Sequence, residues 1–261
     1  MIPKIIHYCW FGKKKKPTLV KKCIKSWHQH MPDFEFNEWN ESNCDLTSPF
    51  LQSCIKNKKW AFISDYIRLK KVYEYGGIYL DTDMLVFKNL DPLLKHDCFF
   101  GAEDFNYINA SVMGSVKNNM FINKLIDSYK KIEGITSNTD LTEITIPKII
   151  TKCLKQEVNL SNVIFDKVEN FQEITVYPYK YFYPLPFDKR YEVKNYSQFC
   201  YEETYAIHLW NASWIDYSEF HYLRVGEYRK GFLKILSGKN SQKVNLKYLK
   251  KIIVSIYKSL K

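Results

Sequence analysis

Residues 59–87 place a long helical pattern directly before an apolar run that is interrupted by two aspartates. "KWAFISDYIRLKKVYEYGG" predicts a helix, which Gly76-Gly77 ends because glycine commonly terminates helices. "IYLDTDMLVF" then predicts a buried strand. Carboxylates are costly to bury among apolar residues, so Asp81 and Asp83 need charged or polar partners. Any fold that this chain adopts must bring such partners to this strand.

The spacing of Asp81 and Asp83 predicts a metal site. Residues i and i+2 of an extended strand project from the same face, so the two carboxylates are expected to converge. Like charges that close repel unless a cation lies between them, and hard divalent ions such as Mg²⁺ or Mn²⁺ prefer oxygen ligands. The alternative is a solvated turn that happens to bear two aspartates, which the apolar flanks argue against.

A second charged pair lies in the preceding helix. Asp65 and Arg68 are three residues apart and therefore share a helix face. A surface ion pair at this spacing is worth only about 0–1 kcal/mol. Apolar residues surround this pair on most sides, however, so the helix and its ion pair are expected to be buried. A buried pair that a short hairpin joins to two carboxylates is typical of a functional site.

Two further residues have both a functional and a structural interpretation. His208 follows a strand-like run in "YAIHLWNASW" and either completes a metal shell or contacts diphosphate, or else is a structural hydrogen-bonding residue. Trp10 ends the first predicted strand, "PKIIHYCWFG", where it either packs in the core or stacks on a base.

The predicted elements indicate an α/β fold. A first strand, a helix over "TLVKKCIKSWHQHM" and a second strand over "FEFNEW" form a βαβ opening, which favours a largely parallel sheet. Further helices are predicted over "NNMFINKLIDSYKKI" and "IPKIITKCL", and "DCFFGAED" predicts a strand with a loop. The length of 261 residues suits one large domain with an appendage.

Three blocks of the chain resemble the DXD-containing sugar transferases of glycosyltransferase family 32. They are "IPKIIHYCWFG", "AFISDYIRLKKVYEYGGIYLDTDMLVFKNLDPL" and "AIHLWNASW". That family includes bacterial capsule and lipooligosaccharide enzymes and is related to the clostridial glucosylating toxins. The resemblance implies a GT-A fold with a mixed, mostly parallel sheet, a nucleotide-sugar donor (usually a UDP-sugar), Mn²⁺ or Mg²⁺, and retention of anomeric configuration.

The resemblance also implies roles for individual residues. The nucleotide sugar would be bound by Trp10, Asn43, Asp65, Arg68, Tyr79, Asp81, Ser213 and Trp214. The metal would be bound by Asp81, Asp83 and His208. The catalytic residues would be Asp65, Arg68 and Asp81, with Arg68 neutralising the leaving diphosphate and a carboxylate stabilising the oxocarbenium-like sugar. The function that follows is transfer of a hexose or N-acetylhexosamine to a cell-surface glycan or lipid-linked acceptor.

The positive charge is concentrated at the C-terminal end of the chain. Residues 229–261 contain ten basic and no acidic residues, so a net charge of +11 leaves +1 for residues 1–228. We therefore expect a GT-A domain over 1–228 and a basic amphipathic helical tail over 229–261. The apolar seam of this tail lies at Leu246, Leu249, Ile253, Ile256 and Leu260. The tail either docks on an anionic membrane surface or packs on the body or on a second copy of the chain.

Other functions and locations follow less directly from the sequence. A nucleotidyl or sugar-phosphate transferase could use the same metal site, but the early Gly-rich phosphate loop that it needs is missing. Nucleic-acid binding is not expected, because basic residues are confined to the tail rather than interleaved with aromatics across a surface. Irregularly spaced cysteines and an N-terminus unlike a signal peptide predict a cytoplasmic protein, peripheral on the inner membrane face if the tail docks there.

Overall fold

The computed structural model describes residues 1–135, 139–159, 163–211, 218–224, 226–236 and 245–259. Contacts divide the chain into two compact units, Met1–Asn211 and Ala212–Lys261. The boundary expected between residues 228 and 229 lies inside the second unit, because helix α6 (Glu219–Arg224) packs against both α7 (Tyr228–Leu236) and α8 (Leu246–Ser259).

The first unit is built on a seven-stranded mixed sheet with the order β2-β1-β3-β6-β5-β8-β7. β6 and β7 run opposite to the other five strands. The predicted α/β class and mixed, mostly parallel sheet are therefore confirmed. The strands of this sheet are β1 (Ile5–Cys9), β2 (Glu35–Trp39), β3 (Gly77–Leu80), β5 (Cys98–Ala102), β6 (Ile108–Ser115), β7 (Glu169–Phe171) and β8 (Ile174–Tyr177).

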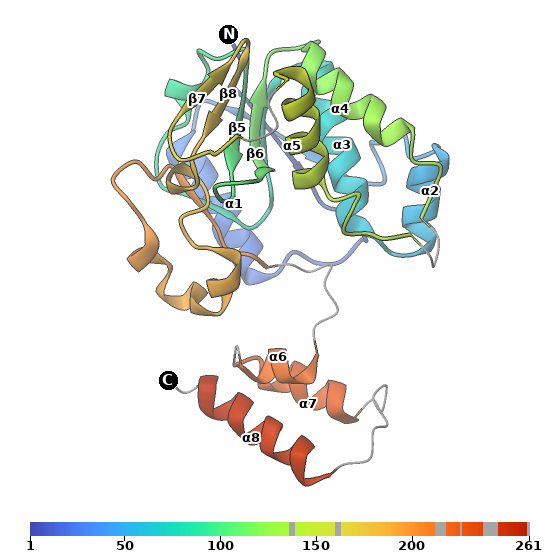
Figure 1. Cartoon of the computed structure of the whole chain (residues 1–261), viewed down its shortest axis with the longest axis vertical. Coiled ribbons are helices and arrows are strands. Elements are labelled where there is room, and N and C mark those ends of the chain that lie inside the picture. The colour runs from blue at the N-terminus through green and yellow to red at the C-terminus, as the bar shows by residue number, and fades with distance from the viewer. Residues whose placement is uncertain (136–138, 160–162, 212–217, 225, 237–244, 260–261) are drawn as a thin grey trace. The chain divides into compact units, whose positions relative to one another are not determined.

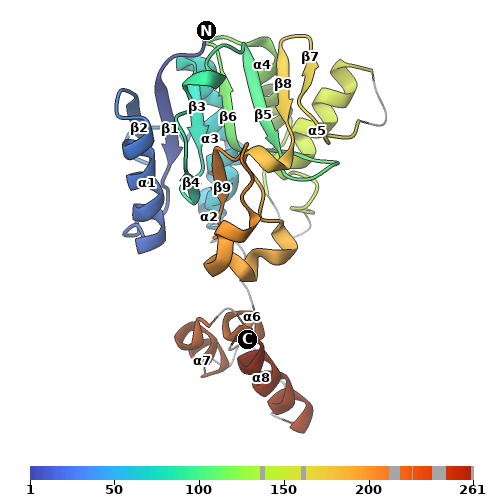
Figure 2. The same cartoon turned by 90° about the vertical axis from the view of Figure 1, so that its left-hand side faces the viewer.

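Hydrophobic residues form one cluster on each face of this sheet. Alternation along β3 sends Tyr79 to one cluster, and Ile78 and Leu80 to the other. On the Tyr79 face, α3, α4 and α5 lie side by side (Figure 1). The opposite cluster includes α1 (Figure 2). The helices of this unit are α1 (Thr18–His30), α2 (Pro49–Lys56), α3 (Trp60–Tyr75), α4 (Met120–Lys130) and α5 (Ile146–Glu157).

The predicted helix before the two glycines is α3, and it is buried as its apolar surface implies. Its buried residues include the charged Asp65 and Arg68 as well as Ile63 and Ile67. The helix ends at Gly76, whose amide donates to the Val72 carbonyl at 2.8 Å. Because the next strand begins at Gly77, the end of α3 is tied directly to the start of β3.

The predicted single strand over 78–87 is two strands joined by a turn. β3 ends at Leu80 and β4 (Met84–Val86) leaves the main sheet to pair antiparallel with β9 (Ala206–His208). The amide of Met84 donates to the Asp81 carbonyl at 2.9 Å, which closes the turn. The prediction that Asp81 and Asp83 lie on one continuous strand is therefore wrong, because the chain turns here to pass from one sheet to the other.

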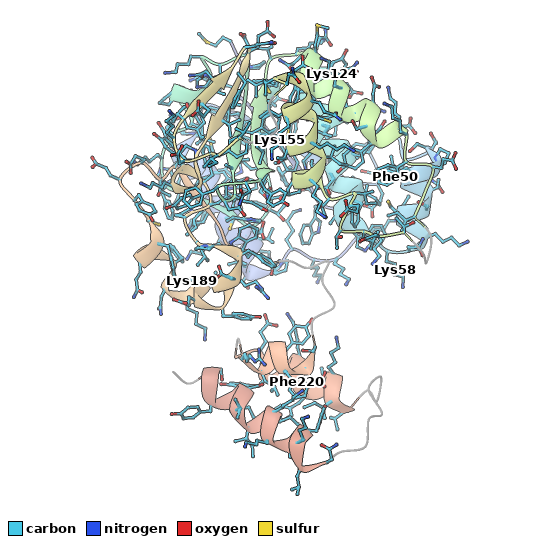
Figure 3. All side chains as sticks on the ribbon, viewed as in Figure 1. Phe50, Lys58, Lys124, Lys155, Lys189 and Phe220 are labelled. Atoms are coloured by element: carbon cyan, nitrogen blue, oxygen red, sulfur yellow. The ribbon has the colours of Figure 1, made fainter. Side chains whose placement is uncertain are left out.

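The second unit contains the predicted tail helix. In α8, Tyr248 and Ser255 share the face that packs within this unit: the Tyr248 hydroxyl donates to Glu219 at 2.9 Å, and Ser255 is buried. The predicted seam lies on another face, where Leu246 is 86% and Ile253 67% exposed. Among the described residues, no helix is long and apolar enough to span a membrane. Figure 3 shows the side chains of both units.

Candidate functional site

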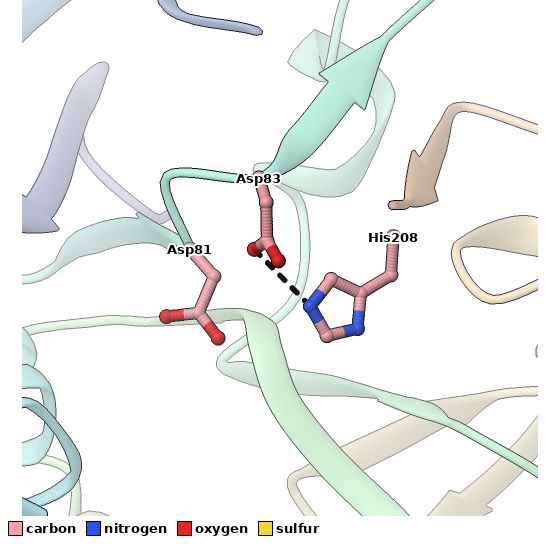
Figure 4. A group of neighbouring side chains, drawn as sticks. All are labelled: Asp81, Asp83 and His208. Carbon is pink, nitrogen blue, oxygen red and sulfur yellow. Dashed lines mark hydrogen bonds and ion pairs between the residues drawn. The ribbon is translucent and has the colours of Figure 1, made fainter. Parts of the chain in front are cut away.

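Asp81, Asp83 and His208 come together at the turn between β3 and β4 (Figure 4). The antiparallel pairing of β4 with β9 places His208 opposite Met84, next to Asp83 in the chain. One ligand atom from each of the three side chains lies within 4.8 Å of the other two. The amide of Asp81 donates to the Ser111 carbonyl at 2.8 Å, so β6 holds the turn in place.

Asp83 and His208 form a buried pair. An oxygen of Asp83 lies 3.1 Å from Nε2 of His208, and its other oxygen accepts a hydrogen bond from the Asn211 amide at 2.8 Å. Burial raises the pKa of Asp83, but the charge and hydrogen bond of His208 outweigh it and hold that pKa below its usual value. Burial likewise lowers the pKa of His208, but the carboxylate of Asp83 outweighs it and the net pKa is raised.

This donor set fits a divalent cation. Two carboxylates and one imidazole are ligands that Mn²⁺ and Mg²⁺ accept; Asp83 and His208 are buried, and Asp81 is partly exposed. The Nδ1 atom of His208 is buried and has no hydrogen-bond partner among the described residues. Without a cation, Asp83 is held by the His208 imidazole and the Asn211 amide, and a cation bound by Asp81, Asp83 and His208 would take the place of the direct Asp83–His208 contact.

Arg68 connects the carboxylates of α3 and of the turn. Its guanidinium lies 2.9 Å from Asp65 and 3.1 Å from Asp81, and it donates to the Ala110 carbonyl at 2.8 Å. The hydroxyl of Tyr79 donates to Asp81 at 2.9 Å. Burial raises the pKa of Asp65 to about 7, against the opposing effect of Arg68. Asp81 is therefore shared between this network and the group that includes Asp83 and His208.

The remaining predicted site residues are not in the group formed by Asp81, Asp83 and His208. Trp10 follows β1, whose parallel pairing with β3 puts it at the same sheet edge as Asp81, and its indole donates to the Lys14 carbonyl at 2.6 Å. Asn43 donates to the Glu38 carbonyl at 2.8 Å and closes the loop after β2. Ser213 and Trp214 lie outside the described residues.

The structure adds residues that sequence reasoning missed. Glu103 follows β5 directly, and Asn109 lies at the start of β6. Trp210 packs on His208 with ring centroids 4.0 Å apart. A signal existed for Glu103, because it is an acid directly after a buried apolar run, as Asp81 is. No sequence pattern pointed to Asn109, since its position next to the site depends on which strands pair.

Residues 17–100 match the family described as the glycosyltransferase sugar-binding region containing the DXD motif. Mannosyl phosphorylinositol ceramide synthase CSH1 of Saccharomyces cerevisiae is 31% identical over 135 residues, covering 50% of this chain and 36% of that protein. The uncharacterized glycosyltransferase L373 of Acanthamoeba polyphaga mimivirus is 27% identical over 226 residues, covering 82% of this chain and 84% of that protein.

Among solved structures, the PaToxG glycosyltransferase is 20% identical, covers 60% of this chain and 70% of its own, and superposes with a TM-score of 0.48. The chain matches little more than a third of the length of the yeast relative, at 36%. The matched segment 17–100 contains both carboxylates of the turn and the Asp65–Arg68 pair, whereas Trp10 and His208 lie outside it.

Proposed function

We propose that this chain, which over residues 17–100 is similar to the glycosyltransferases with a DXD motif, transfers a sugar from a nucleotide-diphosphate donor to a glycan or lipid-linked acceptor. The observation that carries the proposal is the convergence of Asp81, Asp83 and His208 within 4.8 Å. The two aspartates lie in the matched segment, and His208 joins them from outside it. Such a group can hold a diphosphate through a divalent cation.

Asp81, Asp83 and His208 would hold that cation, with Mn²⁺ or Mg²⁺ fitting the oxygen-rich donor set. When bound, the cation neutralises negative charge on the leaving diphosphate. The chain's own residues do the rest. Arg68 is buried, and its ion pairs with Asp65 and Asp81 fix its position, so its positive charge is pre-organised at the same edge.

The donor contacts proposed for the remaining residues follow from their places at this edge. Trp10 would stack on the base, and Tyr79 would contribute by fixing the orientation of Asp81. Asp65 and Asp81 are the carboxylates proposed to stabilise positive charge on a sugar that keeps its anomeric configuration. Asn43, Ser213 and Trp214 remain proposed nucleotide-sugar contacts. A UDP-linked hexose or N-acetylhexosamine is the proposed donor.

Incubation of the protein with a panel of nucleotide sugars tests the proposal. With Mn²⁺, one or more donors should release the nucleoside diphosphate and free or transferred sugar, and chelation should stop the release. Release of pyrophosphate or of a nucleoside monophosphate would instead indicate a nucleotidyl or sugar-phosphate transferase. If no donor in the panel shows metal-dependent binding, the proposal of a nucleotide-sugar enzyme is contradicted.

We also propose that the second unit docks on an anionic membrane surface, at the cytoplasmic side. The seam of α8 is exposed at Leu246, Leu249 and Ile253, whereas a different face of α8 packs on α6. Lys247, Lys250 and Lys251 are exposed as well. An exposed apolar stripe flanked by lysines is typical of interfacial helices, and this surface would deliver the enzyme to a lipid-linked acceptor.

Vesicle co-sedimentation distinguishes the membrane from a second copy of the chain. A triple variant Leu246→Asn, Leu249→Asn, Ile253→Asn should lose binding to vesicles that contain phosphatidylglycerol, with the helix content unchanged. The matched control is Met120→Asn in α4 of the first unit, which removes an exposed apolar side chain and leaves the seam and its lysines intact. If the wild type instead forms dimers by light scattering, and the triple variant makes it monomeric with unchanged vesicle binding, the seam is a dimer interface.

A further inference from the structure

Glu103 is an acid at the same sheet edge that the proposed function leaves without a role. β5 runs in the same direction as β1 and β3, so the carboxyl ends of these three strands lie together. β6 lies between β3 and β5 in the opposite direction and therefore starts at this edge. Glu103, directly after β5, thus shares its edge with Asp81, directly after β3.

A continuous set of hydrogen bonds joins Glu103 to the turn that carries Asp81. The Asn109 side-chain amide donates to Glu103 at 2.6 Å. The Asn109 side-chain oxygen accepts from the amide and from the hydroxyl of Ser111, both at 2.8 Å. The Ser111 carbonyl in turn accepts from the Asp81 amide at 2.8 Å. The orientation of Glu103 is therefore fixed by hydrogen bonds that lead to the turn carrying Asp81.

Glu103 is a carboxylate without a balancing cation. Within the part of the chain that the structure describes, no lysine or arginine forms an ion pair with it, and Asn109 is its one side-chain hydrogen-bond donor. Burial raises its pKa, and the positive charge of His208 acts in the opposite direction. The side chain is only partly buried, so its second oxygen has room for a further donor.

A carboxylate at this place disfavours a diphosphate and favours a ligand group that donates hydrogen bonds. Sugar hydroxyls meet this condition, because each O–H group donates one hydrogen bond to an acceptor-only carboxylate. A site that pairs with hydroxyls also discriminates against sugars that lack them or point them elsewhere, since an oxygen of the carboxylate is then left without its ligand partner.

We propose that Glu103, oriented by Asn109, accepts hydrogen bonds from hydroxyl groups of the donor sugar and so helps to select which sugar is transferred. This inference rests on the proposed nucleotide-sugar function and adds a specificity-determining residue to it. The nucleotide and its diphosphate do not contact Glu103 in this arrangement, so their binding is independent of it.

Binding of UDP and of UDP-sugars in the presence of Mn²⁺, measured by calorimetry on the full chain, separates these contributions. The variants are Glu103→Gln, which removes the charge at constant size, and Glu103→Asp, which keeps the charge but withdraws it by one methylene. Glu203→Gln, in an exposed position, is the matched control. Both Glu103 variants should bind UDP as the wild type does, and should lose about ten-fold or more of the affinity for the preferred UDP-sugar.

The same variants should also flatten the ranking among UDP-glucose, UDP-galactose and UDP-N-acetylglucosamine in donor hydrolysis without acceptor. Wild-type ranking and affinity in either variant would overturn the inference. An equal loss for UDP and for UDP-sugars would overturn it too, because Glu103 would then act through His208 and the cation. A loss seen only when an acceptor is added would assign Glu103 to the acceptor instead. If the wild type binds no nucleotide sugar, the proposed function itself fails.

Discussion

Asp81 and Asp83 carry the same functional group but meet different neighbours. Asp81 accepts from Arg68 and Tyr79, whereas Asp83 accepts from His208 and the Asn211 amide. Asp81 is consequently held by a permanent positive charge. Asp83 is held by an imidazole and a backbone amide, neither of which carries a permanent charge. Of the two, Asp83 should therefore be the more sensitive reporter of metal binding.

Replacing Asp83 by Asn should abolish metal-dependent turnover and also lower the stability, because it breaks the buried pair with His208. Asn keeps an oxygen that can accept from the Asn211 amide, but it removes the charge that a cation requires. We expect donor hydrolysis to fall by about 100-fold or more, with a higher Mn²⁺ requirement for any that remains. The measurement is hydrolysis rate against Mn²⁺ concentration, with the melting temperature recorded in parallel.

The control for this change is Asp33→Asn, which removes an exposed carboxylate paired with Lys4 at 2.5 Å. Exposed ion pairs of this kind contribute about 0–1 kcal/mol, so the control should keep its activity and nearly all its stability. Turnover of the Asp83 variant at the wild-type rate and metal requirement would contradict the assignment of a cation to this turn.

At the scale of elements, the sequence was most informative where a local signal and the tertiary structure agree. The helix before Gly76-Gly77 was predicted because its own residues specify it, and the burial of Asp65 and Arg68 followed from their apolar neighbours. The break of the predicted strand at Asp81 was missed because the pairing of β4 with β9 depends on residues more than a hundred positions away. For the same reason, the sequence could not predict that Glu103 lies at the edge of the sheet that carries Asp81, because this depends on the strand order.

His7 links three elements and makes their packing sensitive to pH. It is fully buried in β1, lies 2.7 Å from the Gly76 carbonyl through Nε2, and accepts at Nδ1 from the Trp39 indole at 3.1 Å. These two bonds use a neutral imidazole whose proton is on Nε2. Burial lowers the pKa of His7 from 6.5 to about 4, although the bond to Gly76 opposes this.

The stability of the first unit should therefore fall as the pH is lowered from about 6.5 towards 4. In that window the unfolded chain binds a proton at His7 that the folded chain does not, and each pH unit contributes up to about 1.4 kcal/mol. By pH 5 the free energy of unfolding should drop by about 2 kcal/mol through this residue alone. Urea unfolding at pH 8 and pH 5 measures the difference.

His7→Gln provides the comparison, because Gln offers one donor and one acceptor but does not titrate. It should be less stable than the wild type at pH 8, yet lose about 2 kcal/mol less between pH 8 and pH 5. The exposed His28→Gln variant keeps His7 and should respond to pH as the wild type does. An identical pH response in the wild type and in His7→Gln would show that His7 is not the group that titrates.

At the scale of the whole molecule, charge and chemistry are divided along the chain. The residues proposed to bind donor and metal lie before residue 212 wherever the structure describes them, whereas ten basic residues without an acid occupy 229–261. Attraction of these lysines to anionic lipid is screened by salt over about 8–10 Å at physiological ionic strength. Asp83 and His208 of the proposed metal site are buried and are much less affected by such screening.

Raising the salt concentration should therefore separate membrane binding from catalysis. Lysines near an anionic surface contribute about 1 kcal/mol each, so Lys247→Gln, Lys250→Gln and Lys251→Gln together should weaken vesicle binding by on the order of 100-fold. For the wild type, raising sodium chloride from about 0.05 to 0.5 M should release the protein from vesicles, since the Debye length falls several-fold. Hydrolysis of a soluble nucleotide sugar should change much less over the same range. If both fall in parallel, the positive charge of the second unit acts on the donor itself rather than on a membrane.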